Sequence, residues 1–438
     1  MATTIVSIAT ASGQGAIGIV RISGDSAFKI AGEIFQTKNV IFKPRMLYLG
    51  NIKAGNVSDQ VLMVQFASPN SFTGEDVVEF QCHGGEVVLR SIVKKAIELG
   101  AQPATQGEFS QRAFLNGKMN LTQVEGIADI INAESETEAE IAFGLFGGGL
   151  SKKVKILQDK LMDVMLYVEA SFDYPEEEMP QIGTAENISA VKFVREEIEK
   201  TLQTYSYGKK VKEGVKVAII GNPNVGKSSI LNRLCGEERA IVTEIAGTTR
   251  DIVEVRFVYK DLKFSFFDTA GIRQTEDIVE KIGVERGVDL AKKADVLLAV
   301  FDERGIDNEI LSLCNKDKTI VVFNKIDGGY QVPQLREFNC VEISAKEEQN
   351  LATLYEMIYE KAKVKKSDGL VLTNERHYFA LNTALEMLKN LQKDIEVLPA
   401  DLIAIDMKQI WETLGSITGT TSSEEIVNAI FSRLCLGK

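Results

Sequence analysis

The stretch "GNPNVGKSS", residues 221–229, matches the pattern G-x-x-x-x-G-K-[ST] and decides the fold of the middle of this chain. It lies between an apolar, strand-like run, "VKVAII", and a helix-like run, "SSILNRL". In that setting the glycines let backbone N–H groups curl around phosphates, and the helix N-terminus adds its positive dipole end. Lys227 is expected to reach the β- and γ-phosphates, and the Ser228 hydroxyl to bind Mg²⁺. The stretch therefore predicts a P-loop nucleotide-binding domain of the α/β type.

Three further motifs follow the P-loop in order, each at the end of a strand-like run. "DTAG" (268–271) places Asp268 behind the Mg²⁺ ligands. "NKID" (324–327) supplies Asp327, which can accept hydrogen bonds from the N1–H and 2-amino groups of guanine, and "SAK" (344–346) can cover the guanine O6. Because adenine leaves these polar groups unpaired, such pairing discriminates strongly between the bases. The ordered motifs predict a GTPase.

The residue after "DTAG" is unusual for such an enzyme. Ras-type GTPases carry a glutamine there that orients the attacking water, whereas this chain has Ile272, which cannot bond a water. Water orientation and charge neutralisation must therefore come from elsewhere in the protein. The loop "TEIAGTTRD" (243–251) offers oxygen ligands in Thr248 and Thr249. Glu280 is a candidate for positioning the water, although a solvated helix charge is the alternative reading.

Composition limits the other possibilities. A chain of 438 residues is long enough for about two to four domains. Its net charge of −12 argues against a general nucleic-acid coat, because non-specific phosphate binding needs a basic surface. The cysteines are scattered without a C-x-x-C pair, which fits a reducing compartment. No apolar run approaches a membrane span, and the first residues lack the basic region of a signal peptide. We therefore expect a cytoplasmic protein.

Changes in hydrophobic period divide the chain into four segments. Residues 1–118 combine β-branched runs with helix-period segments and predict an α+β domain. Residues 119–213 and 365–438 have helical periods, whereas residues 214–364 alternate short apolar strands with helices, which is typical of a mostly parallel sheet. The expected fold is thus an N-terminal α+β domain, a discontinuous all-helical domain, and an inserted Ras-like P-loop domain.

Longer stretches of the chain resemble the MnmE (TrmE) family of bacterial tRNA-modification GTPases. In the middle of the chain these are "GNPNVGKSSILNRL", "AIVTEIAGTTRD", "DTAGIR" and "VEKIGVERG". In the first domain they are "SFTGEDVVEFQCHGG" and "GEFSQRAFLNGKMNLTQVEGIADII", and the last residues match C-x-G-K. The departures are Asn222, where Arg is frequent, and Gln106 and Gln111, where Pro and Glu are common. None of these is a position that we assign to chemistry.

The resemblance implies a potassium-activated GTPase whose G domains meet across the nucleotide in a homodimer. Potassium would take the place of an arginine finger and would be held by Asn224, Thr243, Ile245 and Thr248. This implication agrees with the incomplete switch at Ile272.

The family also suggests roles for the other residues of the nucleotide site. Thr249 would join Ser228 on Mg²⁺, and Glu280 would orient the catalytic water through a bridging water. The residues implied to bind GTP lie in the four motifs and in the loop before the switch: Asn224, Val225, Gly226, Lys227, Ser228, Ser229, Thr243, Glu244, Ile245, Ala246, Gly247, Thr248, Thr249, Asp268, Thr269, Ala270, Gly271, Asn324, Lys325, Asp327, Ser344, Ala345 and Lys346.

A folate site in the N-terminal domain is a further implication of the resemblance. That domain would dimerise and bind 5-formyl- or 5,10-methylene-tetrahydrofolate as a one-carbon donor. By motif position Arg21, Glu79 and Lys118 would line the site. Arg21 and Lys118 could pair with the carboxylates of the glutamate tail, and Glu79 could accept hydrogen bonds from the pterin. Taken alone, each of these side chains reads as a surface charge.

The chain ends in "FSRLCLGK". Ser422 and Glu425 have the spacing of a capping box, so the last helix is expected to begin at Ser422. Gly437 would permit a turn that delivers Cys435 and Lys438 to the folate pocket. Cys435 is then either a thiolate activated by a nearby cation or a small half-buried side chain. The contact between Lys438 and folate is implied by the family alone.

The function implied by the resemblance is a modification of tRNA. With the flavoprotein MnmG (GidA), the chain would add a carboxymethylaminomethyl or aminomethyl group to C5 of the wobble uridine of certain tRNAs. The partner would carry FAD, hold most of the tRNA, and form a heterotetramer or larger assembly. GTP hydrolysis would drive closure and opening of the G domains. The alternative is a regulatory GTPase switch in ribosome assembly, which predicts a monomer that neither depends on potassium nor binds a one-carbon ligand.

Two other patterns carry no function in this reading. "GQGAIG" (13–18) matches G-x-G-x-x-G, but the strand-like "AIGIVRIS" follows it instead of the helix that a dinucleotide site requires. Cys82 lies beside His83 in "QCHGGE", but no other His or Cys pattern completes a metal site. We expect this pair to be structural.

Overall fold

The structure is a computed structural model. It describes residues 3–37, 41–172, 182–234, 236, 254–260, 262–268, 292–363, 369–395, 398–432, 434 and 437. The chain divides into two compact units, which we describe separately. The first comprises Met1–Ala128, Phe143–Arg195 and Thr383–Lys438, and the second comprises Asp129–Ala142 and Glu196–Asn382.

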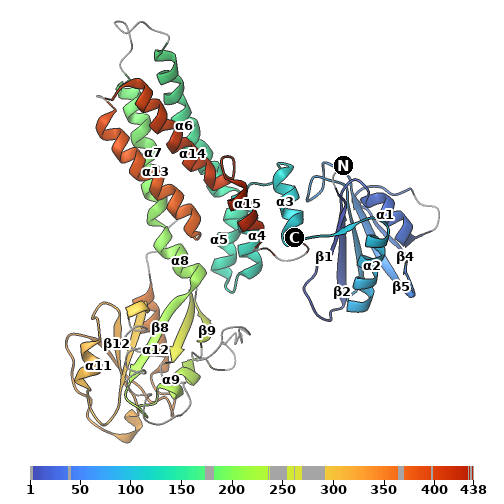
Figure 1. The fold of residues 1–438 in the computed structure, drawn as a ribbon. Coiled ribbons are helices and arrows are strands. Elements are labelled where there is room, and N and C mark those ends of the chain that lie inside the picture. The colour runs from blue at the N-terminus through green and yellow to red at the C-terminus, as the bar shows by residue number, and fades with distance from the viewer. Residues whose placement is uncertain are drawn as a thin grey trace. The chain divides into compact units, whose positions relative to one another are not determined.

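The first unit begins with a seven-stranded sheet in the order β3-β4-β5-β6-β2-β1-β7 (Figure 1). Helices α1 (Ala27–Ile34) and α2 (Glu86–Glu98) pack against this sheet through a shared apolar core. Because successive strand residues alternate between faces, Val20 and Ile22 enter that core while Arg21 lies on the opposite face. The strands are β1 Ile5–Ile8, β2 Ile17–Ser23, β3 Phe35–Gln36, β4 Leu47–Ala54, β5 Val57–Phe66, β6 Val77–His83 and β7 Gln102–Pro103.

Helices dominate the rest of the first unit. Gln158 on α6 donates its Nε2–H to the carbonyl of Trp411 on α14 at 2.9 Å, and Arg195 on α7 donates to Gln392 on α13 at 2.7 Å. Segments that precede and follow the P-loop domain in the sequence therefore form one discontinuous helical domain, as predicted, whereas its boundaries stay predictions. The helices that lie wholly or partly in this unit are α3 Glu108–Leu115, α4 Leu121–Asn132, α5 Glu136–Phe146, α6 Gly149–Ser171, α7 Ala185–Gln203, α13 Glu375–Asp394, α14 Ala400–Thr418 and α15 Glu424–Phe431.

The start of the last helix differs from the prediction. Helix α15 begins at Glu424 after the N-cap residue Ser423, whose side chain makes no capping hydrogen bond. The Ser422 hydroxyl instead donates to the carbonyl of Ser416 at 2.9 Å. That carbonyl lies in the last turn of α14, where helical carbonyls lack intrahelical partners. The predicted capping box from Ser422 to Glu425 is therefore wrong.

The second unit contains a six-stranded sheet in the order β13-β12-β11-β8-β10-β9, in which only the β9–β10 pair is antiparallel. Val217 and Ile219 of β8 enter one core, and Ala218 and Ile220 enter a second core on the other face. Burial on both faces explains the continuous apolar run "VKVAII". The elements are α8 Tyr205–Glu213, β8 Val215–Gly221, α9 Lys227–Leu234, β9 Glu254–Tyr259, β10 Leu262–Asp268, β11 Val296–Phe301, α11 Asn308–Ser312, β12 Thr319–Phe323, η1 Ile326–Gly328, β13 Asn339–Glu342 and α12 Leu351–Ala362.

Among the helices that the structure describes, none is both long and apolar enough to span a bilayer.

Candidate functional site

The P-loop connects the end of β8 to the start of α9. Helix α9 begins at Lys227, whose ammonium donates to the carbonyls of Gly221 and Asn222 at 2.8 and 2.9 Å. Ser228 and Ser229 follow in the first turn and are exposed. Gly226 has a φ of +96°, and a Cβ at that position would collide with the amide nitrogen of Asn324. The second glycine of the motif is therefore required by both backbone conformation and space.

The predicted guanine-recognition loop "NKID" contacts the P-loop, and "SAK" contacts "NKID". Asn324 is 2% exposed and donates its Nδ2–H to the carbonyl of Val225 at 2.8 Å, while the N–H of Ala345 donates to its Oδ1 at 3.0 Å. The Ser344 hydroxyl donates to Oδ1 of Asp327 at 2.6 Å, and this bond lowers the pKa of the Asp327 carboxyl. These contacts bring "NKID" and "SAK" together at the edge of the sheet where the P-loop lies.

An acidic residue that sequence reasoning missed also joins this edge. Asp302 directly follows β11, is 2% exposed, and accepts hydrogen bonds from both Arg304 and Lys325. Burial alone would raise the pKa of Asp302, but these hydrogen bonds outweigh it and lower the pKa to about 2. No motif marks this position, because its role depends on how the strands align.

The remaining predicted GTP-site residues are only partly described. Asp268 is the last residue of β10, which places it at the same sheet edge as the end of β8. Lys346 is exposed beyond Ala345. The predictions on Thr243, Glu244, Ile245, Ala246, Gly247, Thr248, Thr249, Thr269, Ala270, Gly271 and Glu280 lie outside the described residues.

The N-terminal sheet carries a hollow of about 560 Å³ on one face. Two of the predicted folate residues, Glu79 and Lys118, line it. Arg45, which sequence reasoning missed, contributes a second cation and donates to the carbonyl of Asn70 at 3.1 Å. The complete lining is Arg45, Leu47, Val64, Phe66, Asn70, Ser71, Phe72, Glu79, Gln81 and Lys118.

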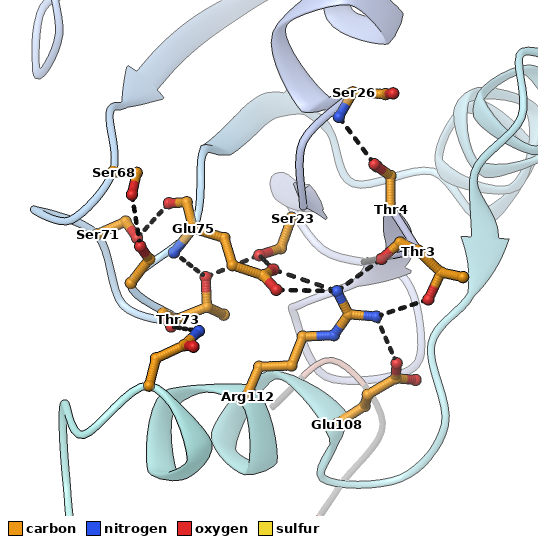
Figure 2. Close-up of polar contacts among 12 residues, drawn as sticks. Thr3, Thr4, Ser23, Ser26, Ser68, Ser71, Thr73, Glu75, Glu108 and Arg112 are labelled. Atoms are coloured by element: carbon orange, nitrogen blue, oxygen red, sulfur yellow. Dashed lines mark hydrogen bonds and ion pairs between the residues drawn. The ribbon is translucent and has the colours of Figure 1, made fainter. Parts of the chain in front are cut away.

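A polar cluster holds the loop that borders this hollow (Figure 2). Arg112 of α3 donates to Glu75 at 3.1 Å and to Glu108 at 2.8 Å. Glu75 also accepts from the Ser23 hydroxyl at 2.7 Å, and that hydroxyl lies 2.7 Å from the Thr73 hydroxyl. These bonds connect α3 to the loop that supplies Asn70, Ser71 and Phe72 to the lining of the hollow.

Arg21 does not line the hollow but bonds a residue that does. It faces Glu79 across the β2–β6 pair, and its Nε donates to Oε1 of Glu79 at 2.8 Å. Its Nη1 donates to the carbonyl of Gly437 at 3.4 Å, so the end of the described tail lies beside Arg21. Cys435 and Lys438 are outside the described residues. The structure thus brings together Arg21, Glu79 and Gly437.

The structure describes the surroundings of both rejected patterns. Strand β2 starts at Ile17, so no helix follows "GQGAIG". Burial raises the pKa of the Cys82 thiol to about 12, and the ring of His83 bonds Asp59 at 2.6 Å. Within the described ranges no cluster of at least three His, Cys, Asp or Glu side chains could hold a metal ion.

The parallel sheet, the P-loop and the two joined recognition loops define the class of protein as a P-loop GTPase. Comparisons with known proteins find matches along the whole length of the chain. The family model described as the MnmE helical domain matches residues 121–435, and the one described as the GTP-binding protein TrmE N-terminus matches residues 4–118.

Relatives of similar length share both regions. The tRNA modification GTPases MnmE of Desulforamulus reducens and Clostridioides difficile are each 40% identical to this chain, with 99% of both sequences covered. Among solved structures, the G domain of the T. maritima FeoB iron transporter is 28% identical over 34% of this chain and 99% of its own, with a TM-score of 0.28.

The chain belongs to the MnmE family of tRNA modification GTPases. Membership makes it an enzyme that hydrolyses GTP, and it implies binding of GTP and Mg²⁺.

Proposed function

We propose that this chain is a potassium-dependent, cytoplasmic GTPase that acts with MnmG on the wobble uridine of certain tRNAs. The observation that carries the potassium requirement is Ile272, which occupies the place of the water-orienting glutamine of Ras-type enzymes. A site without that amide or an arginine finger needs another source of positive charge and another residue to orient the water.

The donor set of the P-loop fits a monovalent cation. Asn224 is exposed and has a left-handed backbone with φ of 64°, a conformation that asparagine tolerates better than most residues. The Asn224 carbonyl accepts a hydrogen bond from the Lys325 ammonium at 2.7 Å. We therefore assign the potassium contact to the side-chain oxygen of Asn224. Thr243, Ile245 and Thr248 would complete the set from the switch loop.

The remaining roles at the nucleotide are assigned by motif position. Ser228 and Thr249 would hold Mg²⁺, which would neutralise charge on the phosphates when bound. Glu280 would orient the attacking water. Asp327, with its depressed pKa, stays ionised and can accept from guanine at neutral pH.

The hollow on the N-terminal sheet fits a reduced folate. Its apolar lining, which includes Phe66 and Phe72, suits a flat ring, and Glu79 can accept from ring N–H groups. Lys118 and Arg45 offer the positive charge that a glutamate tail requires. Arg21 and Lys438 would act from the border of the hollow, and Cys435 would be the catalytic thiol there. A bound reduced folate would supply a one-carbon unit.

The assembly is proposed on charge and family grounds. A net charge of −12 makes extensive phosphate binding by this chain unfavourable. MnmG would therefore hold most of the tRNA and carry FAD, in a heterotetramer or larger complex built on a homodimer of this chain.

The test is reconstitution with purified components. The chain, MnmG, unmodified tRNA, 5,10-methylene-tetrahydrofolate, GTP, KCl and an amine (ammonium or glycine) are combined, and the nucleosides are analysed by mass spectrometry. We expect carboxymethylaminomethyl- or aminomethyluridine only when the chain and GTP are both present. Failure to form either nucleoside under conditions in which a known MnmE does so would contradict the proposal.

A further inference from the structure

Asp302 lies beside the P-loop without belonging to any of the nucleotide-binding motifs. The chain turns back directly after it, because the N–H of Gly305 donates to the carbonyl of Asp302 at 3.0 Å. This turn folds the Arg304 guanidinium over the Asp302 carboxylate, with Nε at 2.9 Å from Oδ1 and Nη2 at 3.0 Å from Oδ2. A guanidinium and a carboxylate paired through two parallel bonds hold each other in a defined orientation.

A second cation reaches the same carboxylate from the loop that follows the neighbouring strand β12. The Lys325 ammonium lies 2.7 Å from Oδ2 of Asp302, and it also donates to the carbonyl of Asn224 at 2.7 Å. Arg304 likewise uses Nη2 to donate to the carbonyl of Pro223 at 2.9 Å. Each cation therefore connects Asp302 to one of two consecutive P-loop carbonyls.

Fixing these carbonyls also fixes the N–H groups of the loop. In a planar trans peptide the carbonyl and the following N–H point in opposite directions. Holding the carbonyls of Pro223 and Asn224 against Arg304 and Lys325 therefore directs the N–H groups of Asn224 and Val225 to the other side of the loop. P-loops use N–H groups of this kind to bind phosphate.

The charge of Asp302 matters as well as its hydrogen bonds. Arg304 and Lys325 together bring two positive charges to the loop, one of them bonded to Asn224. A positive charge beside a cation ligand weakens cation binding, and the buried carboxylate offsets one of the two.

We propose that Asp302 is a positioning residue for GTP hydrolysis by this chain. Through Arg304 and Lys325 it orients the phosphate-binding peptides of the P-loop and limits the positive charge around Asn224. The part that concerns potassium rests on the proposed function, whereas the part that concerns nucleotide binding does not.

The experiment uses the full chain with Asp302→Asn, which preserves the shape of the side chain and removes its charge. Three quantities are measured: the dissociation rate of a fluorescent GDP, the KCl concentration that half-activates GTP hydrolysis, and the urea midpoint of unfolding. We expect GDP to dissociate about tenfold faster, a change that corresponds to the loss of roughly one charge-assisted hydrogen bond. We also expect the half-activating KCl concentration to rise about threefold or more.

A matched control is Asp317→Asn, which makes the same charge change at an exposed position before β12. It should leave both kinetic quantities at the wild-type values. A purely structural role for Asp302 would lower only the urea midpoint, so unchanged GDP dissociation and unchanged half-activation in Asp302→Asn would overturn the proposal.

Two further outcomes keep the inference separate from the proposed function. If the wild-type chain shows no activation by KCl, the potassium requirement fails, yet GDP dissociation still tests Asp302. If Asp302→Asn does not fold, Arg304→Gln replaces it, because that guanidinium is half exposed and the buried Asp302 carboxylate keeps its bond to Lys325 when Arg304 is lost. We then expect GDP to dissociate about threefold faster, for the lost bond to Pro223. A wild-type rate in Arg304→Gln would overturn the proposal.

Discussion

Replacing Arg21 with methionine tests the N-terminal pocket most sharply. The guanidinium bonds Glu79 at 2.8 Å, and the two side chains are only 20% and 16% exposed. It also lies over the rings of Phe72 and Phe109, at 5.4 and 5.6 Å from their centroids. Methionine retains the apolar stem but removes the charge, the donor and the ring contacts.

The magnitude follows from those contacts. A hydrogen bond to a charged partner contributes about 1.5–3 kcal/mol, and each cation–π contact adds roughly 0.5–1 kcal/mol. Because such contributions are not additive within one cluster, we expect the free energy of unfolding to fall by about 3 kcal/mol. Glu79 also loses the partner that orients it within the hollow. We therefore expect the affinity for 5-formyl-tetrahydrofolate to fall about 10- to 100-fold, which is roughly 1.4–2.8 kcal/mol.

The assay is titration calorimetry of 5-formyl-tetrahydrofolate, with urea unfolding and GTP turnover measured in parallel. GTP turnover should be unchanged. Arg90→Met is the matched control, because Arg90 pairs with Glu86 on the surface of α2 while 74% exposed, and such pairs contribute about 0–1 kcal/mol. A double variant with Glu79→Gln should bind folate no worse than Arg21→Met alone. Wild-type folate affinity in Arg21→Met, or full additivity in the double variant, would contradict a role of the Arg21–Glu79 pair in folate binding.

Three other predictions concern the second unit. Lys263→Met should lower the free energy of unfolding by about 3 kcal/mol. The buried Lys263 ammonium lies 3.7 Å from the equally buried Glu138 carboxylate, and burial raises the pKa of Glu138. An unchanged urea midpoint in Lys263→Met would argue against this. Asp302 has a pKa lowered to about 2, so its contribution of about 2 kcal/mol should be present above pH 4 and disappear as the pH falls toward 2. Unfolding of wild-type and Asp302→Asn chains over that range checks this, and a stability difference that does not shrink would be inconsistent with it. Glu280→Ala should retain GTP affinity but lose hydrolysis by about 100-fold or more, and wild-type turnover would remove Glu280 from the catalytic centre.

The arrangement of the P-loop beside "NKID" and "SAK" could be predicted from sequence, because these parts are short, contiguous and tied to strand ends. The glycines and Lys227 of the P-loop specify a backbone path locally, and each recognition motif follows an apolar run that the structure forms as a strand. The discontinuous helical domain was also predictable, since its helical period stops before residue 214 and returns after residue 364.

Residues that act through contacts distant in sequence left no comparable signal. Asp302 gains its role from a tight turn and from the parallel alignment of β11 with β12, and neither is encoded in a motif. Arg45 joins the hollow on the N-terminal sheet because it precedes β4, which pairs with β5. The capping box failed because the Ser422 hydroxyl bonds a carbonyl of α14 instead of its own helix.

The central claim is that a monovalent cation completes the catalytic centre that Ile272 leaves open. The most direct test is GTP turnover by the full chain in KCl and in NaCl at matched ionic strength and several protein concentrations. We expect turnover to be faster in KCl by about tenfold or more, a modest part of the roughly 10³–10⁵ that an arginine finger supplies. We also expect turnover per protomer to rise with protein concentration. Equal rates in the two salts, independent of protein concentration, would contradict the claim.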